Sequence, residues 1–154
     1  MQLLFVCTGN TCRSAMAEAI ARRLIAGRGL TGLTVASAGT SAWEGAPASD
    51  GAMLVGIERK LDLSGHRSRA LSPEIVDAAS LVLTMGPHHL ERVEALGGGG
   101  KAHLLTDFAE ENSAGRAISD PFGGGLDQYR ETADELERLI GRALDRLSRD
   151  VGFA

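Results

Sequence analysis

The sequence predicts an α/β fold in which helices flank a parallel β-sheet. Short continuous apolar runs, typical of buried strands, alternate along the chain with segments whose apolar residues recur at helical spacing. Alternating strands and helices form right-handed βαβ units, and these build a parallel sheet. The chain has 154 residues, enough for one domain with its own hydrophobic core, so we expect a single domain over residues 1–154.

The first unit is a strand, a glycine-containing loop and a helix. Residues 3–7 form an apolar run that predicts a buried strand, and residues 14–25 show the apolar spacing of a helix. In sheets of this kind, ligands bind at the carboxyl ends of the strands. Residues 7–14 are therefore the predicted site.

The remaining elements follow from the same patterns. Further strands are predicted at residues 34–38, 81–85 and 102–105, and helices at residues 49–61, 73–77 and 88–96. The sequence Ser72-Pro73 predicts a helix cap followed by proline at the first helical position. The last helix is marked by one apolar stripe: Leu136, Leu139, Ile140, Ala143, Leu144, Leu147 and Val151.

Composition excludes several classes of protein. A net charge of −4 with scattered basic residues argues against binding to nucleic acid. Apolar runs are too short to cross a membrane, and we expect a cytoplasmic protein. Two cysteines are too few for a disulfide scaffold or a four-thiolate zinc site.

The predicted site contains the pattern Cys-x5-Arg-Ser, from Cys7 to Arg13 and Ser14. Loop amides and a helix N-terminus form a concave anion site, and Arg13 adds a bidentate grip on phosphate oxygens. Gly9 and Asn10 are residue types that tolerate the positive φ such a loop requires.

The same positive surroundings favour the thiolate form of Cys7, to which Ser14 can donate a hydrogen bond. Attack of that sulfur on phosphorus gives a covalent phosphocysteine. The amides and Arg13 then hold the oxygens on which transition-state charge gathers. A buried cysteine that acts only as a small apolar residue is the competing interpretation.

A second loop, residues 119–125, supplies a candidate acid. Pro121 keeps Asp120 out of the helical region, so its carboxyl group can project from the loop. A bound phosphate would favour the protonated form of this carboxyl group, which could protonate a leaving group and then accept a proton from water. A plain Asp-Pro turn is the alternative.

Four segments in the same order resemble the low-molecular-weight protein tyrosine phosphatase family. They are residues 6–14, 37–40 and 62–68, and the dipeptide Asp120-Pro121. The resemblance implies a flavodoxin-like, four-stranded parallel sheet and an enzyme that uses no metal and no cofactor. It also implies Cys7 as nucleophile, Arg13 as clamp and Asp120 as general acid.

The resemblance assigns further roles within the loop. It implies that the phosphate is bound by Thr8, Gly9, Asn10, Thr11, Cys12 and Ser14. Asn10 and Ser37 would hold the loop conformation, and Cys12 would form a reversible disulfide with Cys7 on oxidation, unless it is an inert thiol. The family usually has proline where this chain has Ala15, and alanine is also a good helix former.

Thr11 is informative about the substrate. Tyrosine-directed members commonly carry an aliphatic residue there, and a subgroup with threonine resembles bacterial protein arginine phosphatases. Facing an aromatic ring, the hydroxyl would be left unpaired, at a cost of roughly 1–3 kcal/mol. The stretch Phe122-Gly-Gly after Asp120-Pro121 and the residue Tyr129 also resemble that subgroup. Trp43 fits either substrate, as a wall for an aromatic ring or a stacking partner for a guanidinium.

We therefore expect a monomeric phosphatase of phosphorylated proteins that acts on phosphoarginine, with phosphotyrosine as the alternative. A thioredoxin-coupled arsenate reductase would need more cysteines for its disulfide relay. A non-catalytic phosphopeptide-binding module would not need an acid at Asp120. Residues 97–101 superficially resemble the phosphate loop of nucleotide hydrolases but lack its first glycine and its final serine or threonine.

Overall fold

The fold is organised around a four-stranded parallel sheet. The computed structural model describes residues 1–152. Its strands are β1 (Gln2–Cys7), β2 (Thr34–Gly39), β3 (Leu81–Thr84) and β4 (Ala102–Leu104). They lie in the order β2-β1-β3-β4, and every neighbouring pair is parallel. The predicted α/β fold with four parallel strands is confirmed, and β1 lies inside the sheet between β2 and β3.

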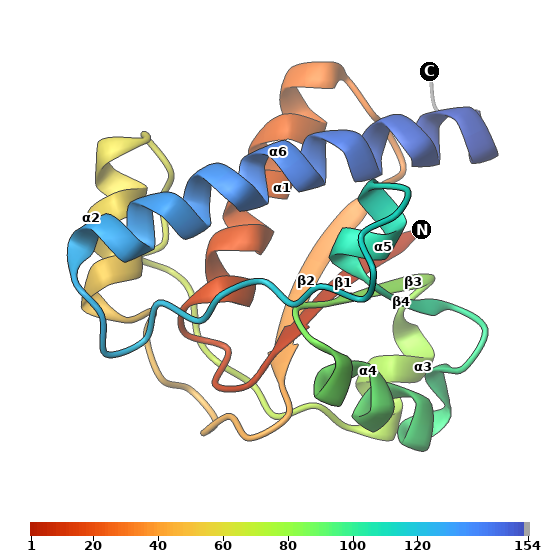
Figure 1. Cartoon of the computed structure of the whole chain (residues 1–154), viewed down its shortest axis with the longest axis horizontal. Helices are drawn as coiled ribbons and strands as arrows, with labels where there is room; N and C mark the ends of the chain where they lie inside the picture. Colours follow the sequence, from red (N-terminus) through yellow and green to blue (C-terminus); the bar gives the residue numbers. More distant parts are fainter. Residues whose placement is uncertain (153–154) are drawn as a thin grey trace.

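Helices cover both faces of the sheet (Figure 1). Along β1, Leu3, Phe5 and Cys7 belong to a large apolar cluster, whereas Leu4 and Val6 belong to a smaller one. This alternation follows from the period of two in a strand. The large cluster includes residues of α1 (Arg13–Arg28), α2 (Asp50–Glu58), α5 (Leu105–Ala109) and α6 (Leu126–Val151). The small cluster includes Val76 of α3 (Pro73–Ala78) and Val93 of α4 (Pro87–Val93).

The helices differ from the prediction in four places. Helix α2 ends at Glu58, three residues before the predicted end at residue 61. Helix α1 continues to Arg28, and Gly29 ends it at φ 65°, a conformation that glycine adopts without strain. Helix α4 passes into a π-helical segment, Glu94–Gly98, at the glycine run. The short helix α5 begins at Leu105, where the fourth strand was expected to end. It was not predicted, because five residues carry too little periodicity for a helix to be recognised.

Helix α6 spans the molecule and packs on α1, α2 and α5 (Figure 1). Its predicted apolar stripe is buried except for Val151, which lies at the helix end and is exposed. Arg59, just after α2, contacts Asp134 and Glu137 of α6, and Arg130 contacts Glu58. Exposed pairs of this kind contribute little individually, so the apolar stripe holds the helix in place.

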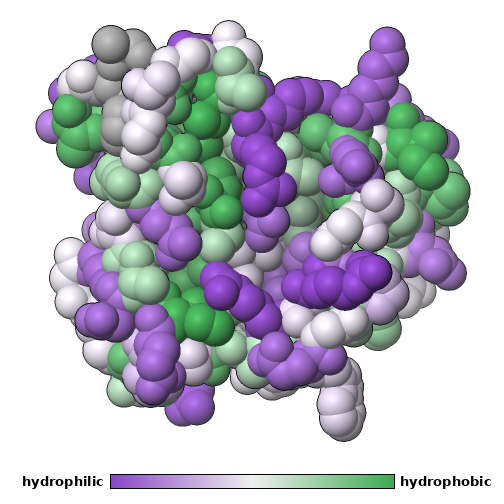
Figure 2. Space-filling view, turned by 180° about the vertical axis from the view of Figure 1, so that it is seen from behind, coloured by the Kyte–Doolittle hydropathy of each residue, from purple (hydrophilic) through white to green (hydrophobic). Residues whose placement is uncertain are grey.

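The surface is mixed in character. On the face that Figure 2 shows, hydrophilic side chains are interspersed with small apolar areas. Among residues 1–152, none of the helices is long and apolar enough to cross a membrane.

Candidate active site

A pocket of about 300 Å³ opens at the carboxyl end of β1. Its lining combines the loop after β1 with three other segments of the chain. The lining residues are Cys7, Thr8, Gly9, Thr11, Cys12, Arg13, Ser41, Trp43, Ala46, Ser68, Asp120 and Phe122. The structure therefore brings the predicted nucleophile, clamp and acid together at one pocket.

The Cys7 thiol is buried and has two hydrogen-bond partners. Its Sγ lies 2.8 Å from Ser14 Oγ and accepts from the Asn10 backbone N–H at 3.3 Å. Ser14 Oγ also accepts from Asn10 Nδ2 at 2.8 Å, so its own hydrogen is free to point at the sulfur. Both contacts of Cys7 can therefore donate towards the sulfur.

Asn10 organises the loop from beneath the pocket. It is fully buried and has φ 57°, in the left-handed region that asparagine tolerates better than most residues. Its Nδ2 also donates to Ser37 Oγ at 2.9 Å, and its Oδ1 accepts from the Arg69 N–H at 3.0 Å. His66 Nε2 donates to the Asn10 carbonyl at 2.6 Å. The expected pairing of Asn10 with Ser37 is present, whereas Gly9 does not adopt a positive φ.

Glu18 extends this network and was missed in the sequence. Ser37 donates to Glu18 Oε1 at 2.7 Å, and Glu18 also pairs with Arg22 at 2.9 Å. Because a carboxylate only accepts, it fixes the Ser37 hydrogen on the Glu18 side and leaves a Ser37 lone pair for Asn10. A usable signal was its position four residues after Ser14, on the same face of α1.

Gly39 is the point at which β2 comes closest to the loop. A Cβ there would lie 2.4 Å from the Thr8 carbonyl oxygen and 2.9 Å from the Asn10 nitrogen. Backbone N–H groups of the following residues, Thr40 and Ser41, donate to the carbonyls of Cys7 and Thr8 at 2.9 Å. The end of β2 therefore supports the loop directly, and only glycine fits at position 39.

Arg13 links the loop to the segment that carries Asp120. Its guanidinium is buried, and NH1 donates to the Ile118 carbonyl at 3.0 Å. Its NH2 lies 3.5 Å from Asp120 Oδ2. Asp120 is about half exposed, and its Oδ1 accepts from the Phe122 N–H at 3.0 Å. The proposed clamp and the proposed acid are thus in direct contact at the pocket.

Cys12 is buried next to two hydroxyl groups. Its Sγ lies 3.2 Å from Ser49 Oγ and 3.4 Å from Tyr129 Oη. Burial and the contact with Cys12 raise the pKa of Tyr129 to about 12, so the phenol stays protonated. Cys7 and Cys12 are both free cysteines. Sequence reasoning did not place Tyr129 here, because Cys12 and Tyr129 are 117 residues apart in the chain.

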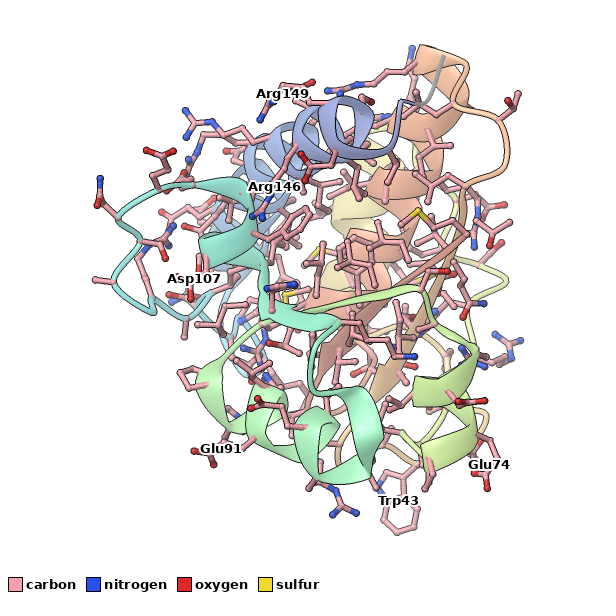
Figure 3. All side chains as sticks on the ribbon, turned by 90° about the vertical axis from the view of Figure 1, so that its right-hand side faces the viewer. Trp43, Glu74, Glu91, Asp107, Arg146 and Arg149 are labelled. Carbon is pink, nitrogen blue, oxygen red and sulfur yellow. The ribbon has the colours of Figure 1, made fainter. Side chains whose placement is uncertain are left out.

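Two exposed aromatic side chains flank the mouth of the pocket. Trp43 is 85% exposed and Phe122 is 71% exposed. Figure 3 shows the Trp43 ring at the edge of the molecule, pointing away from the ribbon. The carbonyl of Trp43 accepts from Ser68 Oγ, which fixes its backbone while the ring stays outside. These rings can contact a substrate without any rearrangement of the core.

The described residues contain no group of three or more histidine, cysteine or acidic side chains placed to hold a metal ion. His88 and His89, adjacent on α4, are no exception.

Comparison with known proteins identifies the family. Residues 2–152 match the family model described as low molecular weight phosphotyrosine protein phosphatase. The chain belongs to this family. It is a cysteine-dependent protein phosphatase, a hydrolase of phosphorylated proteins.

Individual relatives cover nearly the whole chain. A "Protein-arginine-phosphatase" of Geobacillus stearothermophilus is 40% identical over 95% of this chain and 95% of its own length. A protein of that name from Bacillus subtilis (strain 168) is 35% identical over 97% and 99%. A tyrosine phosphatase, PtpB of Staphylococcus haemolyticus, is 34% identical over 92% and 96%.

Solved structures agree with these sequence relatives. The YwlE arginine phosphatase from Geobacillus stearothermophilus superposes with a TM-score of 0.87 at 38% identity, covering 97% of this chain and 94% of its own. A C7S mutant of a YwlE arginine phosphatase, described as having a "phosphorylated active site serine", gives a TM-score of 0.89 at 35% identity, with 99% of both chains covered.

Proposed function

We propose that this phosphatase removes phosphate from phosphoarginine side chains of proteins through a phosphocysteine on Cys7. The observation on which the proposal depends is the position of Thr11, which lies in the loop after Cys7 and lines the pocket. Its hydroxyl makes only a 3.8 Å contact with Cys12 Sγ among the described residues, so it remains available to a substrate. Relatives named protein-arginine-phosphatase, 35–40% identical over nearly the whole chain, support the proposal.

In the first step the Cys7 thiolate attacks phosphorus and the P–N bond breaks. The electron pair of that bond goes to the guanidine nitrogen, which takes a proton from the Asp120 carboxyl group. Loop amides and the Arg13 guanidinium hold the transferring oxygens. The Ile118 carbonyl bonded to NH1 fixes the plane of that guanidinium. The mutant relative with a phosphorylated serine supports residue 7 as the position that receives the phosphoryl group.

In the second step water hydrolyses the phosphocysteine. The Asp120 carboxylate accepts a proton from the water, whose oxygen attacks phosphorus, and the S–P bond breaks to return the Cys7 thiolate and release phosphate. Ser14 and the Asn10 N–H stabilise the departing sulfur, because both already contact Sγ. Ser37 acts through Asn10 and takes no direct part.

Thr11 selects the leaving group in this proposal. Its hydroxyl accepts a hydrogen bond from the guanidinium, whereas an aromatic ring in the same place would leave it unpaired. Trp43 at the mouth stacks on the planar guanidinium, a contact worth ~0.5–2 kcal/mol.

Phosphotyrosine is the second candidate substrate. The specific observation in its favour is the pair of exposed rings, Trp43 and Phe122, at the pocket mouth. Aromatic pairs of substrate and protein contribute about 0.5–1.5 kcal/mol. That gain is no larger than the cost of an unpaired Thr11 hydroxyl, so we rank phosphoarginine first.

The deciding experiment compares kcat/KM on matched phosphoarginine and phosphotyrosine peptides for the wild type and Thr11→Ile. We expect the wild type to prefer phosphoarginine and Thr11→Ile to shift the ratio by about 10-fold or more towards phosphotyrosine, as the unpaired hydroxyl disappears. Thr11→Ser, which keeps the hydroxyl, is the matched control and should retain the wild-type preference. A wild type that prefers phosphotyrosine would refute the arginine assignment.

The proposal extends to the setting of the enzyme. We propose a monomer that acts in the cytoplasm, a compartment that keeps thiols such as Cys7 reduced. The net charge of −4 supports a protein substrate rather than nucleic acid or an anionic membrane surface as the partner. We also propose that residues 1–154 form a single phosphatase domain, since the family match extends from residue 2 to residue 152.

A further inference from the structure

One buried polar side chain beside the loop has no role in the mechanism so far. His89 of α4 is fully buried, and its Nε2 lies 2.8 Å from the hydroxyl oxygen of Thr8. Its Nδ1 is buried and has no hydrogen-bond partner within residues 1–152. Thr8 follows the nucleophile directly and lines the pocket. His89 therefore contacts the site through a single side chain.

The ring of His89 is neutral. Burial, the neighbouring His88 ring and the Arg13 cation lower its pKa from 6.5 to about 3, although the Asp120 carboxylate acts in the opposite direction. A protonated ring would place one N–H on each nitrogen and would leave the buried Nδ1–H without a partner. Geometry and electrostatics thus agree on one ring proton.

The position of that proton follows from the unpaired nitrogen. A buried N–H group without a partner is rarer and costlier than a buried acceptor without one. The tautomer with its proton on Nε2 leaves only a lone pair at Nδ1. In this tautomer His89 donates to Thr8 Oγ1 and not the reverse.

We propose that His89 is a positioning residue that holds Thr8 Oγ1 by donating to it, so that the Thr8 hydroxyl donates its own hydrogen to a phosphoryl oxygen bound in the pocket. An oxygen that already accepts from His89 has its hydrogen left for another partner, and Thr8 Oγ1 has no other partner among the described residues. Thr8 then contributes a side-chain donor in addition to any backbone contact. The inference rests on the proposed function only in requiring that this pocket binds phosphate.

The first test measures the Ki of inorganic phosphate for Thr8→Val, His89→Phe and the double variant. Valine keeps the shape of threonine, and phenylalanine keeps a buried ring. Loss of a hydrogen bond to a charged group predicts a Ki about 10-fold higher for each single variant. Because His89 acts through Thr8, His89→Phe should have almost no effect in the Thr8→Val background.

Two controls separate positioning from a general structural role. His88→Phe alters the adjacent exposed ring, which lies tilted against His89 with centroids 3.8 Å apart, and should leave the Ki unchanged. His89→Gln keeps an N–H donor and should recover most of the affinity. An unchanged Ki for Thr8→Val, or equal effects of His89→Phe in both backgrounds, would overturn the proposal. Inorganic phosphate is the probe, so none of these outcomes depends on the choice between phosphoarginine and phosphotyrosine.

A second measurement uses the wild-type enzyme alone and so does not depend on whether the variants fold. Proton–nitrogen NMR correlation spectra of the histidine rings in the wild-type enzyme report which nitrogen carries the proton. We expect the buried His89 ring to be protonated at Nε2 and bare at Nδ1. A ring protonated at Nδ1 would mean that Thr8 donates to His89, and the proposal would fail even if every variant unfolded.

Discussion

Replacing Asn10 is the most direct way to test how the loop between Cys7 and Arg13 is held. Asn10→Ala removes three side-chain hydrogen bonds, of which those to Ser14 and Ser37 are buried and the one to Arg69 is partly buried. At ~1 kcal/mol net for each bond, this amounts to about 3 kcal/mol. Alanine must also adopt the φ of 57°, which adds about 1 kcal/mol. The expected loss of about 4 kcal/mol is a large part of the 5–15 kcal/mol that typically stabilises a domain.

The assay is urea denaturation at equilibrium, with the free energy of unfolding taken from the midpoint and slope. Asn10→Gly separates the two contributions, because it loses the same hydrogen bonds but adopts positive φ freely. It should be at most about 0.5 kcal/mol more stable than Asn10→Ala, because it escapes the strain of about 1 kcal/mol but glycine adds roughly 0.5–1 kcal/mol of entropy to the unfolded chain. We also expect kcat/KM to fall on the order of 10²-fold in both variants, since the thiolate partners are misplaced. A loss below about 1 kcal/mol for Asn10→Ala would refute the reasoning, because a single buried hydrogen bond is worth that much.

Three further predictions concern single side chains. Asp120→Asn should lower kcat by ~10²–10⁴-fold without raising the Ki of phosphate, because it removes a proton donor but no anion contact; an unchanged kcat would exclude Asp120 as the acid. The second concerns His89, whose pKa is about 3 in the folded protein against 6.5 in the unfolded chain. Its neutral ring costs nothing above pH ~6.5, and the free energy of unfolding should fall by up to ~1.4 kcal/mol per pH unit as the pH is lowered towards 3, because only the unfolded chain binds the proton. Urea denaturation at several pH values should give a free energy of unfolding that depends less on pH in His89→Phe than in the wild type. An equal pH dependence in the two proteins would contradict the lowered pKa of His89. Cys12→Ser should recover less activity than the wild type when reductant follows peroxide, if Cys12 traps oxidised Cys7 as a disulfide; equal recovery would leave Cys12 without a protective role.

The sheet and the residues at the carboxyl end of β1 were predictable because the relevant signals are local. The apolar run before Cys7, the spacing from Cys7 to Arg13 and the Asp-Pro dipeptide at Asp120 each lie within a few residues of sequence. In a parallel sheet the carboxyl ends of the strands lie together, so the loops that follow them meet at one end of the sheet. The pairing of Asn10 with Ser37 was expected from the family resemblance and is present.

The supporting residues were not predictable for the opposite reason. Glu18, Tyr129 and His89 lie on helices and contact residues that are distant from them in the sequence. Nothing in the sequence of α4 distinguishes His89 from the other residues of that helix. Only the three-dimensional structure shows that its ring reaches Thr8, the residue next to Cys7.

The bond between the Arg69 amide and Asn10 Oδ1 has a consequence for cooperativity. Its two residues are 59 positions apart, and the same asparagine is bonded to Ser37 on β2 and to His66. The active loop therefore cannot open by itself as a local fluctuation, since opening it separates segments that the whole fold brings together. In native-state hydrogen exchange, the Arg69 amide should exchange at the rate set by global unfolding and so report the integrity of the catalytic loop without any substrate.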